Sequence, residues 1–189
     1  MATAVWALSY IPAQRQMKEA MRILHSSSMP KGILLLFRTF PCICLFGDRN
    51  REEIIEDNPE VEKWFLIGHS LGGLPISQIA AKQPEKLEGI AFVASLMICD
   101  LSDTDLSAIR ITAEHDGVMP DKMMESNLDY LPENSTSVMI EGANHNQFGA
   151  YWHPGFDGKA TITWKEQQDQ MISLILDFFD EQIHSEDIE

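Results

Sequence analysis

Basic side chains are scarce in this sequence, and no stretch of it gathers them. Lysine and arginine together number 14 among 189 residues, against 29 aspartates and glutamates, so the formal net charge is −15 at pH 7. Nucleic acids and anionic lipid surfaces attract proteins through clustered positive charge. The charge balance therefore argues against a nucleic-acid partner and against docking on a membrane surface.

Cysteine is also scarce. The three cysteines, Cys42, Cys44 and Cys99, form an odd set without the spacing of a zinc site. No group of histidines and carboxylates has ligand spacing either, so we expect neither a metal nor a cofactor. Free thiols in a reducing compartment are the simplest interpretation, and we expect a cytoplasmic protein.

Long apolar runs are missing as well. The stretch Gly32–Phe46 is too short for a membrane span and is interrupted by Arg38 and Pro41. The apolar start Met1–Pro12 has neither a basic beginning nor a convincing cleavage site, so we expect no signal peptide. We therefore expect no membrane association.

Segments of strand and helix character alternate from one end of the chain to the other. Such alternation predicts a parallel sheet covered by helices on both faces. We predict one α/β domain over residues 1–189, with three α/β/α layers, about six strands and a frayed acidic tail over residues 183–189. The expected strands are Val5–Ile11, Ile33–Phe37, Trp64–Ile67, Ile90–Ala94, Ala108–Ala113 and Ser137–Ile140, and the main helices are Gln14–His25, Leu71–Lys82, Asp121–Tyr130 and one that begins at Thr163.

The most informative stretch is Gly68-His69-Ser70-Leu71-Gly72-Gly73, which directly follows the expected strand Trp64–Ile67. It predicts a sharp strand-to-helix turn with Ser70 at its apex, in strained dihedrals that project the hydroxyl. The amide of Leu71 then lies at a helix start, where it can donate to a developing oxyanion. The alternative is a serine that caps an ordinary turn, since Gly-x-Ser-x-Gly also arises by chance.

A serine hydroxyl is a poor nucleophile unless a base accepts its proton and a carboxylate orients that base. His145 lies in a glycine-flanked loop after the last expected strand, and Asp116 follows the strand before it. Because neighbouring residues on a tight turn point apart, we do not take His69 as the base. The order Ser70, Asp116, His145 is that of the α/β-hydrolase triad.

Several segments together resemble the small α/β-hydrolases of the dienelactone-hydrolase-like kind that carry little or no lid. The resemblance extends from about Tyr10 to Phe179. It rests on the turn around Ser70, on His115-Asp116-Gly117-Val118, on Gly142-Ala143-Asn144-His145-Asn146-Gln147-Phe148-Gly149, on Asp157-Gly158, on the helix start Thr163–Gln168 and on Phe46-Gly47-Asp48-Arg49-Asn50.

This resemblance implies an α/β-hydrolase fold that lacks the usual N-terminal antiparallel strands. The strand Ile33–Phe37 would then lie at an edge, and a homodimer contact could cover it. The family's second oxyanion donor lies in a glycine-containing loop, whereas the matching segment Tyr10–Arg15 has no glycine. The amide of Ala13 is the expected donor, with that of Gln14 as the alternative.

The expected activity is hydrolysis of carboxylic esters by Ser70, His145 and Asp116 through an acyl-enzyme. Small or soluble substrates are expected, because the interval from Ser70 to Asp116 is filled by a helix and two strands and leaves no room for a large lid. Two alternatives stay open, a lactonase using the same triad and a catalytically impaired, hydrolase-like binding protein. The residues expected to line a substrate pocket are His69, Gln14 and Phe148.

Overall fold

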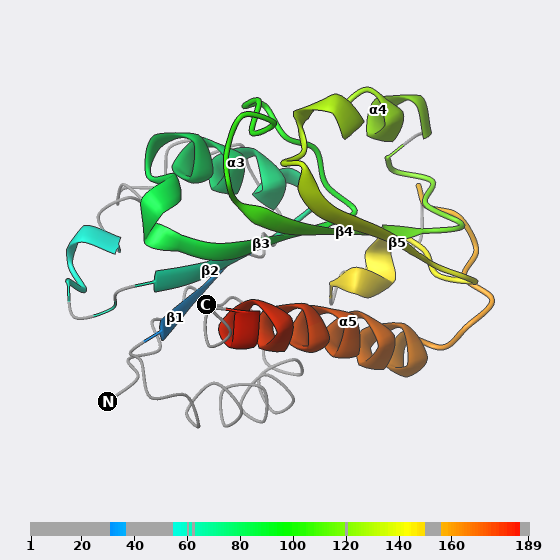
Figure 1. Ribbon diagram of the computed structural model, residues 1–189. Helices are drawn as coiled ribbons and strands as arrows, with labels where there is room; N and C mark the ends of the chain where they lie inside the picture. The colour runs from blue at the N-terminus through cyan, green and yellow to red at the C-terminus, as the bar shows by residue number, and fades with distance from the viewer. Residues whose placement is uncertain are drawn as a thin grey trace.

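The computed structural model describes residues 31–36, 55–59, 61, 63–119, 121–149 and 156–185. Its centre is a five-stranded sheet in the order β1-β2-β3-β4-β5, in which every neighbouring pair is parallel (Figure 1). The strands are β1 (Lys31–Leu36), β2 (Lys63–His69), β3 (Leu87–Val93), β4 (Ser107–Ala113) and β5 (Asn134–Ile140). Five of the expected strands are thereby confirmed, while Val5–Ile11 and the helix expected over Gln14–His25 lie outside the described residues.

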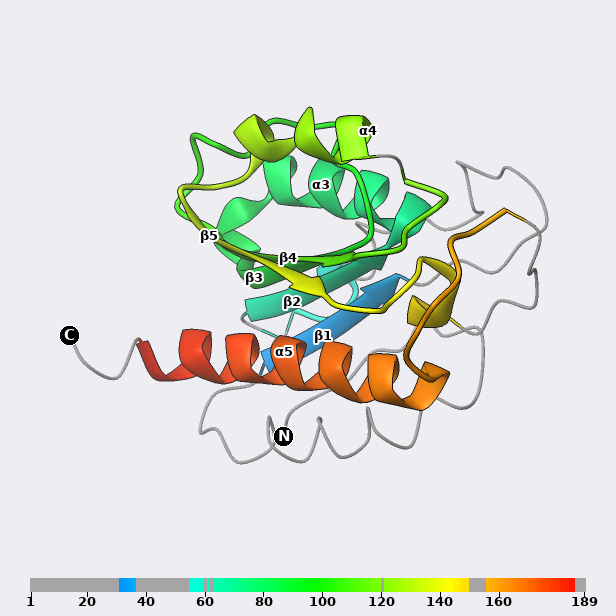
Figure 2. The same cartoon turned by 90° about the vertical axis from the view of Figure 1, so that its right-hand side faces the viewer.

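Helices lie on both faces of this sheet and confirm the three-layer prediction. Helices α3 (Gly73–Lys82) and α4 (Asp121–Glu125) lie on one side, and the long helix α5 (Trp164–Ser185) lies on the other (Figures 1 and 2). Within the described ranges, no helix combines the length and the apolar character that a membrane crossing requires.

Strand β2 supplies both cores, because successive side chains of a strand point to opposite faces. Trp64 and Leu66 pack into the cluster on the α3 side. Phe65 and Ile67 pack into the cluster on the α5 side, where the ring of Phe65 lies 3.9 Å from that of Phe179, centroid to centroid. All four β2 side chains are at most 1% exposed. The continuous apolar run Trp64–Ile67 is therefore that of a strand buried on both faces, as expected in a parallel sheet that helices cover on both sides.

Several boundaries differ from the sequence prediction, among them that of β3, which begins at Leu87, three residues before the expected Ile90. Strand β5 begins at Asn134, three residues earlier than expected, in a polar stretch where hydrophobicity gives no signal. The helix expected over Asp121–Tyr130 is broken into α4 and a 3-10 turn at Leu128–Tyr130. Helix α5 continues through Ser185, so the part of the expected frayed tail before residue 186 is helical.

Helix α5 begins directly after Thr163, where the sequence predicted its start, and a capping box closes its first turn. The amide of Thr163 donates to a carboxylate oxygen of Glu166 over 2.8 Å, and the amide of Glu166 donates back to Thr163 Oγ1 over 3.2 Å. Both bonds satisfy amides that have no partner within the helix. This local exchange fixes where α5 begins, and α5 in turn supports the site described next.

Candidate active site

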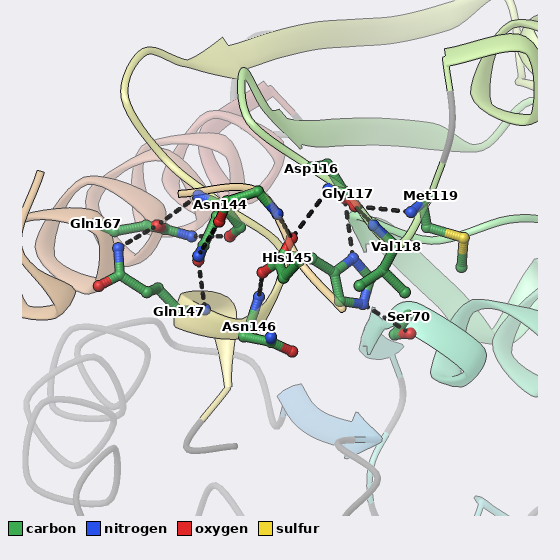
Figure 3. A network of polar contacts seen from close by, with 12 residues as sticks. Ser70, Asp116, Gly117, Val118, Met119, Asn144, His145, Asn146, Gln147 and Gln167 are labelled. Carbon is green, nitrogen blue, oxygen red and sulfur yellow. Dashed lines mark hydrogen bonds and ion pairs between the residues drawn. The ribbon is translucent and has the colours of Figure 1, made fainter. Parts of the chain in front are cut away.

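Three strands end at the same edge of the sheet, and each leads into one of the residues predicted to be catalytic. Ser70 follows β2, Asp116 follows β4, and His145 follows β5. Figure 3 shows the imidazole of His145 between the other two side chains. Carboxyl ends of parallel strands are where open α/β sheets bind their ligands. The structure thus brings together residues that are up to 75 positions apart in the chain.

The backbone at Ser70 has the strained conformation predicted for it. Its φ is +55°, in the left-handed region that residues other than glycine seldom adopt. Gly68 makes the turn feasible, since a Cβ there would lie 2.7 Å from the carbonyl oxygen of Gly72 and from Ile76 Cδ1. Such strain persists only where the surroundings impose it, and it is concentrated at functional sites.

His145 contacts both partners through its two ring nitrogens. Nε2 lies 3.0 Å from Ser70 Oγ, and Nδ1 lies 2.9 Å from Asp116 Oδ2. With the proton on Nδ1, the ring donates to the carboxylate and leaves Nε2 free to accept the serine proton. The side chains of His145 and Asp116 are only 4% and 9% exposed, so little water competes for either bond.

The second oxygen of Asp116 is occupied by its own loop. Oδ1 accepts the amides of Val118, over 2.9 Å, and Met119, over 2.7 Å. These two bonds fix the rotation of the carboxylate and direct Oδ2 at His145. The contact with Val118, two residues on, makes an Asx turn, and this turn itself orients the acid.

His69 and Phe148 lie beneath the imidazole of His145. The ring of His69 is 4.8 Å from that of His145 and 6.0 Å from that of Phe148, centroid to centroid. Their exposed fractions are 0% for His69 and 1% for Phe148. Both side chains thus support His145 from the protein interior, and their place in a substrate pocket stays a prediction.

Burial, followed by the adjacent charge of His145, lowers the pKa of His69 from 6.5 to about 3. The unfolded chain binds a proton at His69 below about pH 6.5, whereas the folded chain resists it. The stability that neutral His69 contributes is therefore complete above that pH and is lost as the pH falls toward 3. We expect wild type to lose about 2 kcal/mol of unfolding free energy between about pH 8 and about pH 5 through this residue.

Urea unfolding of wild type and His69→Gln at both pH values measures this effect. The variant should show a pH-dependent loss smaller by about 2 kcal/mol, because glutamine does not titrate. Comparing the two pH values within each variant removes any general cost of the substitution. Equal pH dependence in the two proteins would contradict the expectation.

Two glutamines at the start of α5 hold the loop that carries His145, and neither was predicted from the sequence. Gln167 accepts the amide of Asn144 at Oε1 over 3.1 Å and donates from Nε2 to the carbonyl of Asn144 over 2.7 Å (Figure 3). Gln168 donates to the carbonyl of Gln147. Their burial, at 0% and 3% exposure, could have been suspected only from polar residues on the otherwise apolar face of the helix.

Of the remaining predicted site residues, only Leu71 lies in the part of the chain that the structure describes. Leu71 lies in the first helical turn after Ser70, where amides have no intrahelical acceptor, and its side chain is exposed. Ala13 and Gln14 lie outside the described residues. Among the residues that the structure describes, no three histidine, cysteine or acidic side chains gather as a metal site would require.

Known proteins resemble this chain in part of its length. "Putative methylesterase 14, chloroplastic" of Arabidopsis thaliana is 42% identical over 48 residues, which make up 25% of this chain and 14% of that protein. A predicted CIB-like hydrolase from Thermoplasma acidophilum superposes with a TM-score of 0.50 at 16% identity, covering 67% of this chain and 56% of its own. A dienelactone hydrolase-like promiscuous phosphotriesterase from metagenomic libraries gives 0.52 at 17% identity, with the same two coverages of 67% and 56%.

These likenesses in structure concern the fold, and the chain spans little more than half the length of either solved protein. The family comparison covers more of the sequence. Residues 10–169 match the model of the alpha/beta hydrolase family. This range contains β1 to β5 and the hydrogen-bonded relay formed by Ser70, His145 and Asp116. The parallel sheet, the strained serine turn and this match lead to one conclusion: the chain belongs to the alpha/beta hydrolase family.

Proposed function

We propose that the protein is a serine hydrolase that cleaves carboxylic esters of small or soluble substrates. The observation that carries the proposal is the relay from Ser70 Oγ through His145 to Asp116, with contacts of 3.0 and 2.9 Å. Hydrogen-bond reach between nucleophile, base and orienting acid is the geometry that nucleophilic catalysis requires. The strained φ of Ser70 supports the same function.

In the proposed reaction, Ser70 Oγ attacks the ester carbonyl while His145 Nε2 takes the hydroxyl proton. The imidazolium that forms is stabilised by Asp116 through Nδ1. When the tetrahedral intermediate collapses, Nε2 gives the proton to the departing alcohol. Water then attacks the acyl-serine with His145 again as base, which releases the carboxylic acid and restores the Ser70 hydroxyl.

The oxyanion of the intermediate would be bound by the amide of Leu71 and a second amide from the Tyr10–Arg15 segment. The expected second donor is that of Ala13, with Gln14 as the alternative. Each such donor contributes on the order of 3 to 4 kcal/mol to lowering the barrier. A misplaced second donor would consequently slow turnover without abolishing it.

Two observations bear on the substrate. Between Ser70 and Asp116 the chain holds only α3, β3, β4 and their connections, so this interval contains no lid domain. The matched Arabidopsis thaliana protein is named a methylesterase, which favours an ester over other hydrolysable bonds. We therefore expect p-nitrophenyl acetate to be cleaved, and a lactone panel measured beside it would test the lactonase alternative.

Labelling with a fluorophosphonate probe tests the proposal directly. We expect the native protein to form one adduct, located on Ser70 by peptide mass spectrometry, because only an activated serine reacts with such probes. Heat-denatured protein and Ser70→Ala should give no adduct. Ser137→Ala is the matched control, since this serine is exposed on β5 and should leave labelling unchanged.

Two results would overturn the proposed function. The first is native, folded protein that forms no adduct, which would favour the hydrolase-like binding protein instead. The second is an adduct that persists in Ser70→Ala, because the reactive group would then lie elsewhere in the chain.

A further inference from the structure

The loop that carries Asp157 joins two others, the loop of Asp116 after β4 and the loop of His145 after β5. Asp157, between β5 and α5, directs its carboxylate at both. Oδ1 accepts the amide of Gly117 over 2.9 Å, and Oδ2 accepts the amide of Asn146 over 2.7 Å. Gly117 is the residue after Asp116, and Asn146 is the residue after His145. One carboxylate thus holds the neighbours of two triad members.

We propose that Asp157 is a positioning residue, whose carboxylate sets the distance between Asp116 and His145. The two oxygens of a carboxylate are held at a fixed separation by covalent geometry. Two amides bound to them are therefore held at a fixed separation too. Bonds to an ionised acceptor are about twice as strong as neutral ones, which suits a residue that must resist movement of both loops.

The surroundings of Asp157 leave the three loops little freedom. A Cβ on Gly158 would lie 1.8 Å from the carbonyl oxygen of His115, so the Asp157 loop touches the acid loop backbone to backbone. The carbonyl of Gly158 accepts Asn144 Nδ2 over 2.8 Å, which joins the same loop to the base loop. The amide of Gly158 donates to Asp157 Oδ1 over 2.8 Å and fixes the carboxylate itself.

The expected consequence concerns catalysis more than binding. Asp157 reaches backbone amides and not the reacting atoms, so its loss should displace Asp116 relative to His145. A displacement of about 1 Å in a catalytic group costs on the order of 10²-fold in rate. This expectation rests on the proposed function, whereas the distance between Asp116 and His145 can be followed whether or not the protein is an enzyme.

The test compares wild type with Asp157→Asn, which has the same shape. In the variant an NH₂ group replaces one carboxylate oxygen, so at least one of the three backbone amides of Gly117, Asn146 and Gly158 faces another donor. We expect kcat for p-nitrophenyl acetate to fall about 10²-fold with KM nearly unchanged. The matched control is Asp177→Asn, an exposed acid on α5 whose variant should keep the wild-type kcat.

The second readout is the downfield proton resonance of His145 Nδ1–H, which reports the bond to Asp116 without any substrate. We expect it to shift or disappear in Asp157→Asn while circular dichroism and thermal unfolding show a folded protein. If that variant does not fold, Asp157→Glu keeps the charge but adds a methylene between the loops, and it should change the resonance and lower kcat in the same direction.

A folded Asp157→Asn or Asp157→Glu with the wild-type resonance and wild-type kcat would overturn the proposal. If wild type shows the resonance but neither hydrolysis nor labelling, the proposed function fails. The effect of Asp157 on the resonance then still decides its positioning role.

Discussion

Replacing His145 by alanine should lower kcat for a p-nitrophenyl ester by on the order of 10⁶-fold at neutral pH. Among the described residues, His145 is the only base within hydrogen-bond reach of Ser70 Oγ, because its Nε2 lies 3.0 Å away. Alanine removes this base. The serine hydroxyl would then keep its proton as it attacks. A residual acceleration of about 10³-fold over water is expected from substrate binding and the oxyanion donors.

His115→Ala is the matched control for this loss. His115 also lies in a loop after a strand, but its side chain turns to Glu114, 3.7 Å away, and is 34% exposed. It should keep kcat within a factor of about two, in line with other surface substitutions. If His145→Ala retained kcat within tenfold of wild type, another group would have to be the base.

Asp116→Asn should lower kcat by on the order of 10⁴-fold while leaving the fold intact. The reason is that the two carboxylate oxygens have different partners, loop amides at Oδ1 and His145 Nδ1 at Oδ2. Oδ1 accepts the amides of Val118 and Met119, so the oxygen of an asparagine would remain on that side. Its NH₂ group would then face His145 Nδ1, which must give up its proton to accept a hydrogen bond.

The displaced proton would move to Nε2, where His145 could no longer accept the proton of Ser70. Nitrogen NMR of the imidazole distinguishes the two tautomers, and steady-state kinetics gives the loss in kcat. A variant with the tautomer of wild type, or with kcat within tenfold of it, would contradict this account of Asp116. Asp177→Asn serves here too, as an exposed substitution of the same kind on α5.

The core, the turn at Ser70 and the start of α5 were predictable because their signals are local. Trp64–Ile67 is continuously apolar, and a strand buried on both faces needs such a run. Ser70 is flanked by the glycine that its turn requires, and the exchange between Thr163 and Glu166 spans only one helical turn. His145 and Asp116 were found from their place after strands, because parallel strands bring such loops to one edge.

The supporting contacts were not predictable, because each joins residues far apart in the chain. Gly117 and Asp157 are 40 positions apart, and Asn144 and Gln167 are 23 apart. An Asp-Gly pair in a loop, or a glutamine in the first turn of a helix, is common for reasons unrelated to catalysis. Only the packing of the loops after β4 and β5 against each other and against α5 gives these residues their partners.

By itself, the sequence determined three features. They are the alternation of strands and helices that makes the sheet parallel, the strained turn at Ser70, and the identity of Ser70 and Asp116 as the two residues that His145 contacts. The first two follow from hydrophobic periodicity and local backbone sterics, which act over a few residues, and the third follows from the chain order of the three residues and their places after parallel strands. The tertiary structure alone decided the distances, the rotation of the Asp116 carboxylate, the burial of His69 beneath His145 and the bridging position of Asp157. Those features depend on hydrogen bonds and packing between loops, and such contacts exist only after the strands have aligned.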